Sequence, residues 1–183
     1  MRKVIVSEFV SLDGVMENPA WTFQFGSKEQ EQFKFDELFA CDALLLGRVT
    51  YSGFAAAWPK MEGTGAYGER MNSMPKYVVS RTLTEMEWNA RLIQGDLAEE
   101  VNRLKGEPGQ DILVFGSCEL VYALTELDLI DEYRLMVFPI VLGSGKRVFR
   151  DGGEKKILRL VESKSFASGV VVLSYEPASK AGK

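Results

Sequence analysis

The sequence predicts a single α/β domain over residues 1–177, in which a mostly parallel central sheet lies between two layers of helices and ends in antiparallel strands. Up to residue 127, short apolar runs that stop at glycine or serine alternate with helical stretches, a pattern typical of βαβ units. From residue 131, strand-like runs follow one another without a helix between them. With 183 residues, 46% of them hydrophobic, the chain has an ordinary size for one globular domain. Residues 178–183 are expected to form a flexible tail.

The N-terminal part contains a predicted strand, a long loop and a predicted helix. Residues 3–9 form a strand-like apolar run, and the turn residues of Ser11–Gly14 end it. A polar and aromatic loop then leads to residues 28–40, which suit a helix. Because Glu31 and Leu38 share one face of that helix, we expect the Glu31 carboxylate to face inward.

Two strand-to-helix junctions offer places for a phosphate group. A short apolar run breaks at Gly47, with Arg48 and Thr50 beside the start of a predicted helix. The run 111–115 breaks in the same way at Gly116-Ser117. The N-terminus of a helix presents free backbone N–H groups and a positive dipole end, which favour an anion. A glycine that only ends a strand is the structural alternative.

The segment between these junctions supplies a third strand end. Residues 58–75 are rich in glycine and irregular, and we expect a mobile loop over a site. Residues 76–80 suit a buried strand that ends at Ser80-Arg81, and Asp96 then caps a helix that stops at Gly106. Because the carboxyl ends of parallel strands meet at one edge of a sheet, all three strand ends are expected at the same rim.

Three further strands are predicted in the C-terminal part. They cover residues 132–138, 155–165 and 169–176, with a hairpin turn at Ser168-Gly169. No helical pattern separates them, so they are expected to pair antiparallel.

Composition excludes several classes of function. The chain has no histidine, which removes Ser-His-Asp triads, Cys-His dyads and almost all zinc sites, so we expect no metal. A net charge of -4 and the lack of a basic stripe argue against nucleic-acid binding. We find no signal peptide and no apolar run long enough to span a bilayer, so a cytoplasmic protein without membrane contacts is expected. Cys41 and Cys118 are expected to stay free thiols.

Taken together, these residues resemble the dihydrofolate reductase-like superfamily, and within it the stand-alone domains similar to the C-terminal reductase of bacterial riboflavin biosynthesis. The resemblance covers nearly the whole chain and implies the fold of that superfamily. It rests on the order of the following segments: Val6-Ser7 to Gly14, Leu46-Gly47-Arg48-Val49-Thr50-Tyr51, Val79-Ser80-Arg81-Thr82-Leu83, Val114-Phe115-Gly116-Ser117 and Phe138 to Phe149.

The resemblance implies NADPH as the cofactor. It assigns Arg48 to the 2′-phosphate and Thr50 to the diphosphate, and Ser80-Arg81 would hold the same 2′-phosphate, for which an arginine fork is well shaped. The family usually has Gly-Gly where this chain has Gly116-Ser117, so the Ser117 hydroxyl is expected to cap the helix or bind phosphate. The full set of implied cofactor-binding residues is Val6, Ser7, Gly47, Arg48, Thr50, Ser80, Arg81, Gly116, Ser117 and Cys118.

The same resemblance implies candidates for the proton donor and the substrate contacts. A carboxylate on the first helix contacts the ring in folate-reducing members, which together with the helical face indicates Glu31. The Ser-x-Asp-Gly segment lines the site in riboflavin-type members, which indicates Asp13. A solvated surface glutamate and a plain turn aspartate are the alternatives. Trp21 and Lys146 are expected to contact the substrate.

The sequence therefore predicts an NADPH-dependent reductase, acting as a homodimer on a small pterin-like or pyrimidine-like heterocycle. Hydride transfer suits a chain without histidine, because the cofactor carries the difficult step and a carboxylate or water supplies the proton. A non-catalytic NADP-binding or regulatory module is the first alternative. A structural or interaction protein whose glycines only end strands is the second.

Overall fold

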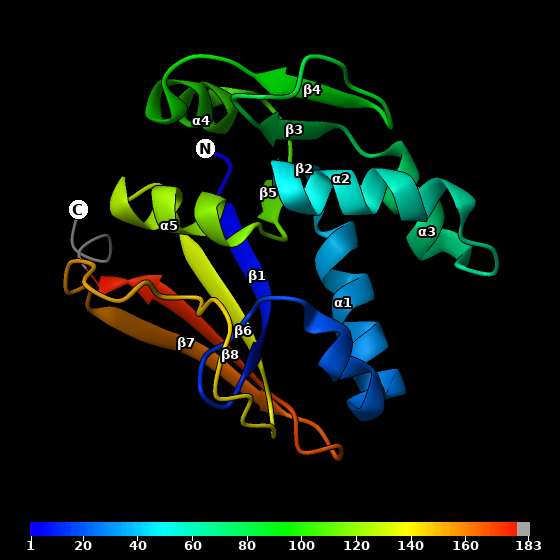
Figure 1. The fold of residues 1–183 in the computed structure, drawn as a ribbon, viewed down its shortest axis with the longest axis vertical. Helices are drawn as coiled ribbons and strands as arrows, with labels where there is room; N and C mark the ends of the chain where they lie inside the picture. Colours follow the sequence, from blue (N-terminus) through cyan, green and yellow to red (C-terminus); the bar gives the residue numbers. More distant parts are fainter. Residues whose placement is uncertain (179–183) are drawn as a thin grey trace.

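Within residues 1–178, which the structure describes, eight strands form one sheet in the order β4-β3-β2-β5-β1-β6-β8-β7 (Figure 1). The structure is a computed structural model. The strands are β1 Val4–Ser11, β2 Cys41–Gly47, β3 Lys76–Val79, β4 Ala90–Ile93, β5 Asp111–Val114, β6 Glu132–Phe138, β7 Leu158–Ser165 and β8 Val171–Pro177. The helices are α1 Lys28–Phe39, α2 Arg48–Ala57, α3 Gly65–Ser73, α4 Leu97–Gly106 and α5 Cys118–Glu126, with the 3-10 helices η1 Pro19–Phe25 and η2 Trp58–Lys60.

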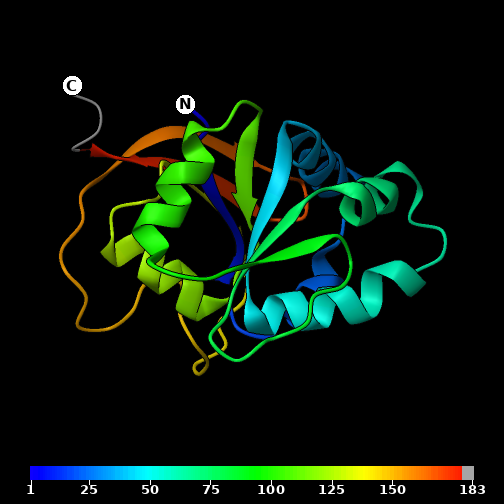
Figure 2. The same ribbon diagram turned by 90° about the horizontal axis from the view of Figure 1, so that it is seen from above.

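Helices cover both faces of the sheet. Alternate residues of the central strands are therefore buried on opposite sides. On β2, Ala43 and Leu45 pack with α4 and α5, whereas Leu44 and Leu46 pack with α1, α2 and α3. Figure 2 shows these two groups of helices on either side of the sheet. A strand buried on both faces reads as a continuous apolar run, which is why β2 is recognisable from the sequence. The predicted three-layer α/β class is confirmed.

Antiparallel pairing is confined to the C-terminal edge of the sheet, as predicted. β1 pairs in parallel with β5 and β6, and β8 pairs antiparallel with β6 and β7. β6 has the predicted bounds, whereas β7 begins later, at Leu158, and β8 begins at Val171. The turn between β7 and β8 contains Gly169 at a φ of 86°, a conformation that favours glycine.

Two elements differ from the prediction. Part of the segment 58–75, which we expected to be a mobile loop, forms α3, and this helix buries Met71 against the α1 side of the sheet. Glycine and polar residues make up much of α3, so it lacks a clear apolar stripe. The edge strand β4 is also absent from the prediction, because its four residues carry too little periodicity to be recognised.

Several local predictions are confirmed. The Asp96 carboxylate accepts a hydrogen bond of 3.0 Å from the backbone N–H of Glu99 at the start of α4, which is the predicted cap. Cys41 and Cys118 are free and buried. Over residues 1–178, no helix has both the length and the apolar character needed to cross a membrane.

The predicted C-terminal tail falls almost entirely on residues 179–183, which lie outside the described residues. Its first residue, Ala178, donates a backbone hydrogen bond of 2.9 Å to the carbonyl of Ile157. Ala178, which we assigned to the tail, is therefore hydrogen-bonded to the domain.

Candidate active site

The three predicted strand ends lie at one rim of the sheet. β3, β2 and β5 are neighbours, with Gly47 of β2 opposite Val79 of β3 and Leu45 of β2 opposite Val114 of β5. Each strand leaves the sheet at this edge, and α2 and α5 both begin there. Two helix N-termini, each with unpaired backbone N–H groups, therefore border the same rim.

Gly47 and Gly116 allow the two junctions to touch. The backbone N–H of Gly47 donates to the carbonyl of Gly116 at 3.0 Å. A Cβ added at Gly47 would overlap the Ser117 hydroxyl and lie 2.8 Å from the Ser117 nitrogen, and one added at Gly116 would lie 2.9 Å from the Thr50 Oγ1. Ser117 occupies the N-cap position of α5 as predicted, but its side chain makes no capping hydrogen bond. The hydroxyl and the first N–H groups of α5 therefore remain available to an anion.

Two arginines flank this junction. Arg48 is the first residue of α2, and Arg81 follows the neighbouring strand β3; both side chains are exposed. Among the described residues neither arginine has a carboxylate partner. The hydroxyl of Ser80 accepts the backbone N–H groups of Thr82 at 3.2 Å and Leu83 at 3.1 Å, which fixes the turn that carries Arg81. Two unpaired guanidinium groups thus stand beside the helix N-termini.

The sheet opens at this rim, because β1 runs past the end of β5. The ladder between the two strands ends with Val6 opposite Val114, whereas β1 stays paired with β6 as far as Ser11. Beyond Val6, the β5 side of β1 faces the Gly116 junction instead of a strand. We call this gap the β1 opening.

Glu8 is a buried carboxyl at the β1 opening. The residue is 8% exposed, and its Oε1 has no hydrogen-bond partner among the described residues. Burial raises the pKa of Glu8 well above its usual range; the ammonium of Lys34 opposes this rise and the carboxylate of Glu37 adds to it. Glu8 therefore keeps a proton at pH values at which an exposed glutamate is ionised.

A cavity of about 520 Å³ lies between the sheet and α1, on the face of β1 opposite Glu8. Its volume is in the range of small-molecule sites. Its apolar walls are Phe9, Phe35, Tyr67 and Met136, and its polar groups are Gln30, Glu31, Lys34 and Thr64. The segment that we expected to cover a site does border this cavity, but as the start of α3 and the residues before it. Apolar walls with a few polar groups are typical of small-molecule sites.

Lys34 is the cation of this cavity wall, and three contacts hold it. Its Nζ donates to the Ser7 hydroxyl at 2.8 Å and forms an ion pair with Glu37. The Ser7 hydroxyl in turn donates to Glu37 at 2.9 Å. The Lys34 ammonium also lies 4.5 Å from the ring centre of Phe115, at the end of β5. The charge is therefore fixed between the cavity and the β1 opening.

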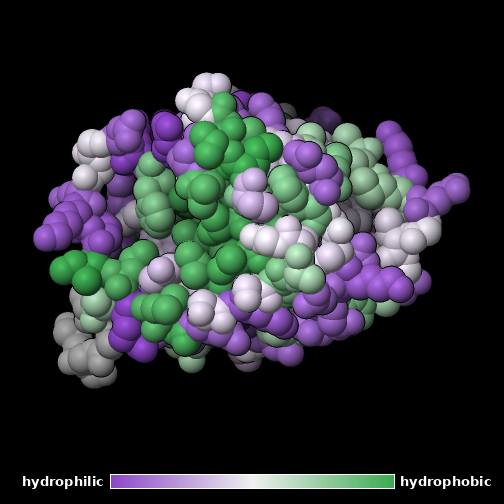
Figure 3. Space-filling view, turned by 90° about the horizontal axis from the view of Figure 1, so that it is seen from below, coloured by the Kyte–Doolittle hydropathy of each residue, from purple (hydrophilic) through white to green (hydrophobic). Residues whose placement is uncertain are grey.

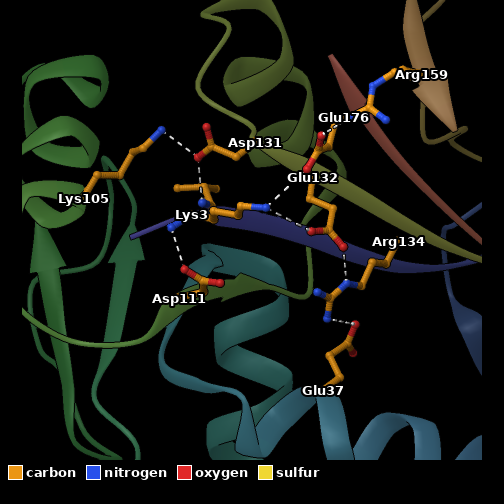
Figure 4. A network of polar contacts seen from close by, with 10 residues as sticks. Lys3, Glu37, Lys105, Asp111, Asp131, Glu132, Arg134, Arg159 and Glu176 are labelled. Carbon is orange, nitrogen blue, oxygen red and sulfur yellow. Dashed lines mark hydrogen bonds and ion pairs between the residues drawn. The ribbon is translucent and has the colours of Figure 1, made fainter. Parts of the chain in front are cut away.

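Glu37 connects this cation to a row of charges along the sheet, drawn in Figure 4. Arg134 lies 3.5 Å from Glu37 and 2.6 Å from Glu132. Lys3 lies 3.9 Å from Glu132 and 3.2 Å from Glu176. Neighbours in this row alternate in sign, so each carboxylate that is removed from water has a cation beside it.

Glu31 is placed differently from the prediction. It lines the cavity, but it is exposed, and the buried residues of α1 are Gln30, Glu37 and Leu38. Leu38, on the predicted inward face, is buried, but Glu31 on the same face is exposed, so the expectation for Glu31 is wrong. α1 also packs polar groups against Ser7 and Arg134, so its apolar residues alone do not mark the buried side.

Asp13 is occupied in holding a loop. Its carboxylate accepts hydrogen bonds from the Ser11 hydroxyl at 2.6 Å and from the backbone N–H groups of Leu142 at 3.1 Å and Gly143 at 2.8 Å. These bonds, that of Ser11 first, lower the pKa of Asp13 to about 2. The hydrogen bonds thus favour the ionised form of Asp13, and its role as the proton donor stays a prediction.

The two predicted substrate contacts do not line the cavity. The Trp21 ring packs edge-on against Phe138 at 5.6 Å, and its indole N–H donates to the carbonyl of Glu17 at 3.2 Å. Lys146 is exposed and forms an ion pair of 2.9 Å with Glu119 in the first turn of α5. Their roles in substrate binding stay predictions.

The remaining predicted residues border the rim or the β1 opening. Val6 is buried in the core at the last β1–β5 pair, and the Ser7 hydroxyl contacts Lys34 and Glu37. Cys118 is the first residue of α5 and is buried. The sequence reasoning missed Glu8 and Lys34. A glutamate in the middle of an apolar strand was a usable signal, because a strand buried on both faces leaves no solvent-facing position for it.

The fold and this rim define an α/β domain of the dihydrofolate reductase-like class. Two glycine junctions, two helix N-termini and an adjacent cavity lie at the carboxyl edge of its sheet, where open α/β sheets bind ligands. The chain belongs to the RibD C-terminal domain family, which residues 2–172 match. Membership of this family suggests reductase activity.

Individual relatives agree with this assignment. The chain is 34% identical over 177 residues to the uncharacterized protein YyaP of Bacillus subtilis (strain 168), covering 95% of this chain and 94% of that protein. A putative riboflavin biosynthesis protein from Shewanella sp. PV-4 has a TM-score of 0.78 and 23% identity, covering 96% of this chain and 98% of that one. A dihydrofolate reductase from Enterococcus faecalis, complexed with NADP(H), has a TM-score of 0.64 and 11% identity, covering 96% of each chain. These two structures show the fold alone.

Proposed function

We propose that the protein is an NADPH-dependent reductase that acts on a small heterocyclic substrate, pterin-like or pyrimidine-like. The observation that carries this proposal is the meeting of three strand ends at one rim, next to a cavity of about 520 Å³. The family assignment supports a reductase, and the enterococcal relative of the same fold is complexed with NADP(H).

The residues at the rim fit a dinucleotide phosphate. Gly47 and Gly116 let the two junctions approach more closely than a Cβ would allow, and the N-termini of α2 and α5 point unpaired N–H groups to the same edge. Thr50 and Ser117 add hydroxyls there. Arg48 and Arg81 would hold the 2′-phosphate, because a guanidinium fork suits a phosphate dianion.

The substrate would occupy the cavity between β1 and α1. NADPH, when bound, supplies the hydride. Phe9 and Tyr67 would sandwich or flank a flat ring, and Lys34 would donate a hydrogen bond to a ring oxygen or nitrogen from its fixed position. Glu31 remains at the cavity wall as a polar contact, and its role as the proton donor is a proposal.

Separate fluorescence titrations with NADPH and NADH test this function. We expect NADPH to bind and NADH to bind far more weakly. In a second assay, a panel of pterin-like and pyrimidine-like compounds is mixed with the protein and NADPH, and we expect one of them to cause oxidation of NADPH. Gly47→Ala should weaken NADPH binding by about tenfold or more, because even a small overlap forces the Ser117 backbone to shift. Gly53→Ala is the matched control, since a Cβ there meets nothing within 4 Å.

The outcomes separate the candidate functions. If neither nucleotide binds, the reductase proposal is wrong. If NADPH binds but no heterocycle is reduced, the non-catalytic NADP-binding module is the better description. If Gly47→Ala weakens NADPH binding no more than Gly53→Ala does, the nucleotide does not bind at this rim.

We also propose that two copies pair through the β7 edge. β7 is the last strand of the sheet, and Leu160 and Val161 on it are 48% and 49% exposed. Figure 3, which views the molecule from the side where β7 lies, shows apolar residues gathered in the middle of that face and hydrophilic ones around them. β7 carries both Arg159 and Glu162, so antiparallel pairing with a second copy can bring opposite charges together.

Light scattering after gel filtration tests the pairing. We expect twice the 20.5 kDa chain mass for the wild type and the single mass for Val161→Glu. Leu127→Glu is the control, because Leu127 is equally exposed, at 47%, but follows α5 away from β7. A wild type of single mass at micromolar concentration would contradict this proposal.

A further inference from the structure

The order of strands places Glu8 at one end of the row of proposed cofactor contacts. β3, β2, β5 and β1 follow one another in the sheet. Along the rim, the chain therefore presents Arg81, then Arg48 and Gly47, then Gly116, and last the β1 opening with Glu8. A dinucleotide with its 2′-phosphate at the arginines and its diphosphate at the glycines extends its nicotinamide end toward this opening. This placement of the nicotinamide, and any role of Glu8 beside it, rests on the proposed function.

Three side-chain atoms from different segments face one point above Gly116. Measured from the position of an added Gly116 Cβ, the Thr50 Oγ1 lies at 2.9 Å, the Glu8 Oε1 at 3.7 Å and the Met16 Cε at 3.9 Å. The Glu8 Oε1 is buried and has no hydrogen-bond partner within residues 1–178. Buried polar atoms in folded proteins are almost always paired, so an unpaired one beside an opening indicates a ligand atom as its partner.

Few ionisable groups face Glu8. Lys34 and Glu37 act on it from α1, and Cys118 lies near it at the start of α5. Burial raises the pKa of the Cys118 thiol to about 11, so that group stays neutral. The residue opposite Glu8 on β6 is Leu135, and Gly116 contributes no side chain. Lys34 is already paired with Glu37, so Glu8 is the acid at this opening whose charge can respond to a ligand.

We propose that Glu8 couples a proton to the redox state of the bound dinucleotide, keeping its proton beside the reduced nicotinamide and losing it beside the oxidised one. The reduced ring is uncharged, whereas the oxidised ring carries a positive charge. In a buried site, a nearby cation strongly favours the ionised form of a carboxyl group. The O–H bond of Glu8 breaks, its electron pair stays on the carboxylate, and the proton passes to solvent. The net charge of the opening is then the same in both redox states.

Calorimetric titrations of the wild-type protein test this coupling. NADP⁺ and NADPH are each titrated at one pH in two buffers that differ in ionisation enthalpy, which gives the number of protons released on binding. The two nucleotides share their phosphates, so the difference between them isolates the nicotinamide. We expect NADP⁺ to release more protons than NADPH, with a difference that approaches one per site. The Kd of NADP⁺ relative to that of NADPH should fall as the pH rises, by up to about tenfold per pH unit.

Two variants locate the group that releases the proton. Glu8→Gln keeps the size of the side chain but cannot ionise, and it should abolish both the difference in protons and the pH dependence of the Kd ratio. Glu126→Gln is the control, because Glu126 is an exposed glutamate of α5 that pairs with Arg150 on the surface, and it should retain both. Equal proton release by the two nucleotides in the wild type, or a difference that persists in Glu8→Gln, would overturn the proposal while leaving NADPH binding intact. If neither nucleotide binds, the proposed function fails, and this coupling fails with it.

Discussion

Replacing both Arg48 and Arg81 with alanine is expected to remove the preference of the protein for NADPH over NADH. Each guanidinium is exposed and without a carboxylate partner among the described residues, so each is available to the 2′-phosphate that only NADPH carries. A hydrogen bond to a charged group contributes about 1.5–3 kcal/mol, which is roughly 10- to 150-fold in Kd for each arginine. Fluorescence titration should therefore show a large rise in the Kd of NADPH and little change in that of NADH.

Arg103→Ala is the matched control for these variants. Arg103 is also an exposed arginine, but it lies on α4, and its two carboxylate partners, Glu100 and Glu107, are local. It should leave both Kd values unchanged. An unaltered NADPH/NADH ratio in the double variant would refute the assignment of the 2′-phosphate to Arg48 and Arg81.

Glu37→Ala is expected to lower the free energy of unfolding by about 3–5 kcal/mol. The Glu37 side chain is 1% exposed, and its removal leaves Lys34 and Arg134 without their shared carboxylate. The Ser7 hydroxyl also loses its acceptor. Chemical denaturation at neutral pH, monitored by circular dichroism, measures this loss, and the midpoint should shift without a change in slope.

Asp36→Ala provides the comparison on the same helix. Asp36 is exposed, and within residues 1–178 its side chain accepts a single hydrogen bond, from Gln32 on the surface. It should change the unfolding free energy by about 0.5 kcal/mol or less. Similar losses for the two variants would mean that Glu37 acts through helix α1 in general and not through the buried charges.

The fold is predictable from the sequence where burial imposes a strong pattern. β2 and β5 lie between helices on both faces, so they appear as apolar runs, and the glycines that follow them mark where the chain turns into α2 and α5. α3 and β4 could not be predicted, because neither has a strong burial pattern. The first lacks a continuous apolar stripe, and the second is an edge strand of four residues that needs only one neighbour.

The site is predictable only in its backbone part. Glycine junctions and the order of parallel strands suffice to bring Gly47, Arg81 and Gly116 to one rim. The side chains of Glu8 and Lys34 are different, because their burial depends on partners far away in the sequence. Lys34, for example, contacts Ser7 across 27 residues of sequence. Periodicity along α1 cannot show that its buried face is partly polar, and so it selected Glu31 in place of Lys34 and Glu37.

The central position of β1 also determines when the domain can form during synthesis. β1 is made first, yet it pairs on one side with β5, where Val4 lies opposite Ile112, and on the other with β6, where Ile5 lies opposite Glu132. Both neighbours leave the ribosome more than a hundred residues after it, so the nascent chain carries an unpartnered apolar strand through most of translation. Such long-range pairing slows folding and prolongs exposure to aggregation. Truncations that end before residue 111 deprive β1 of both neighbours, and we expect them to be degraded or held by chaperones.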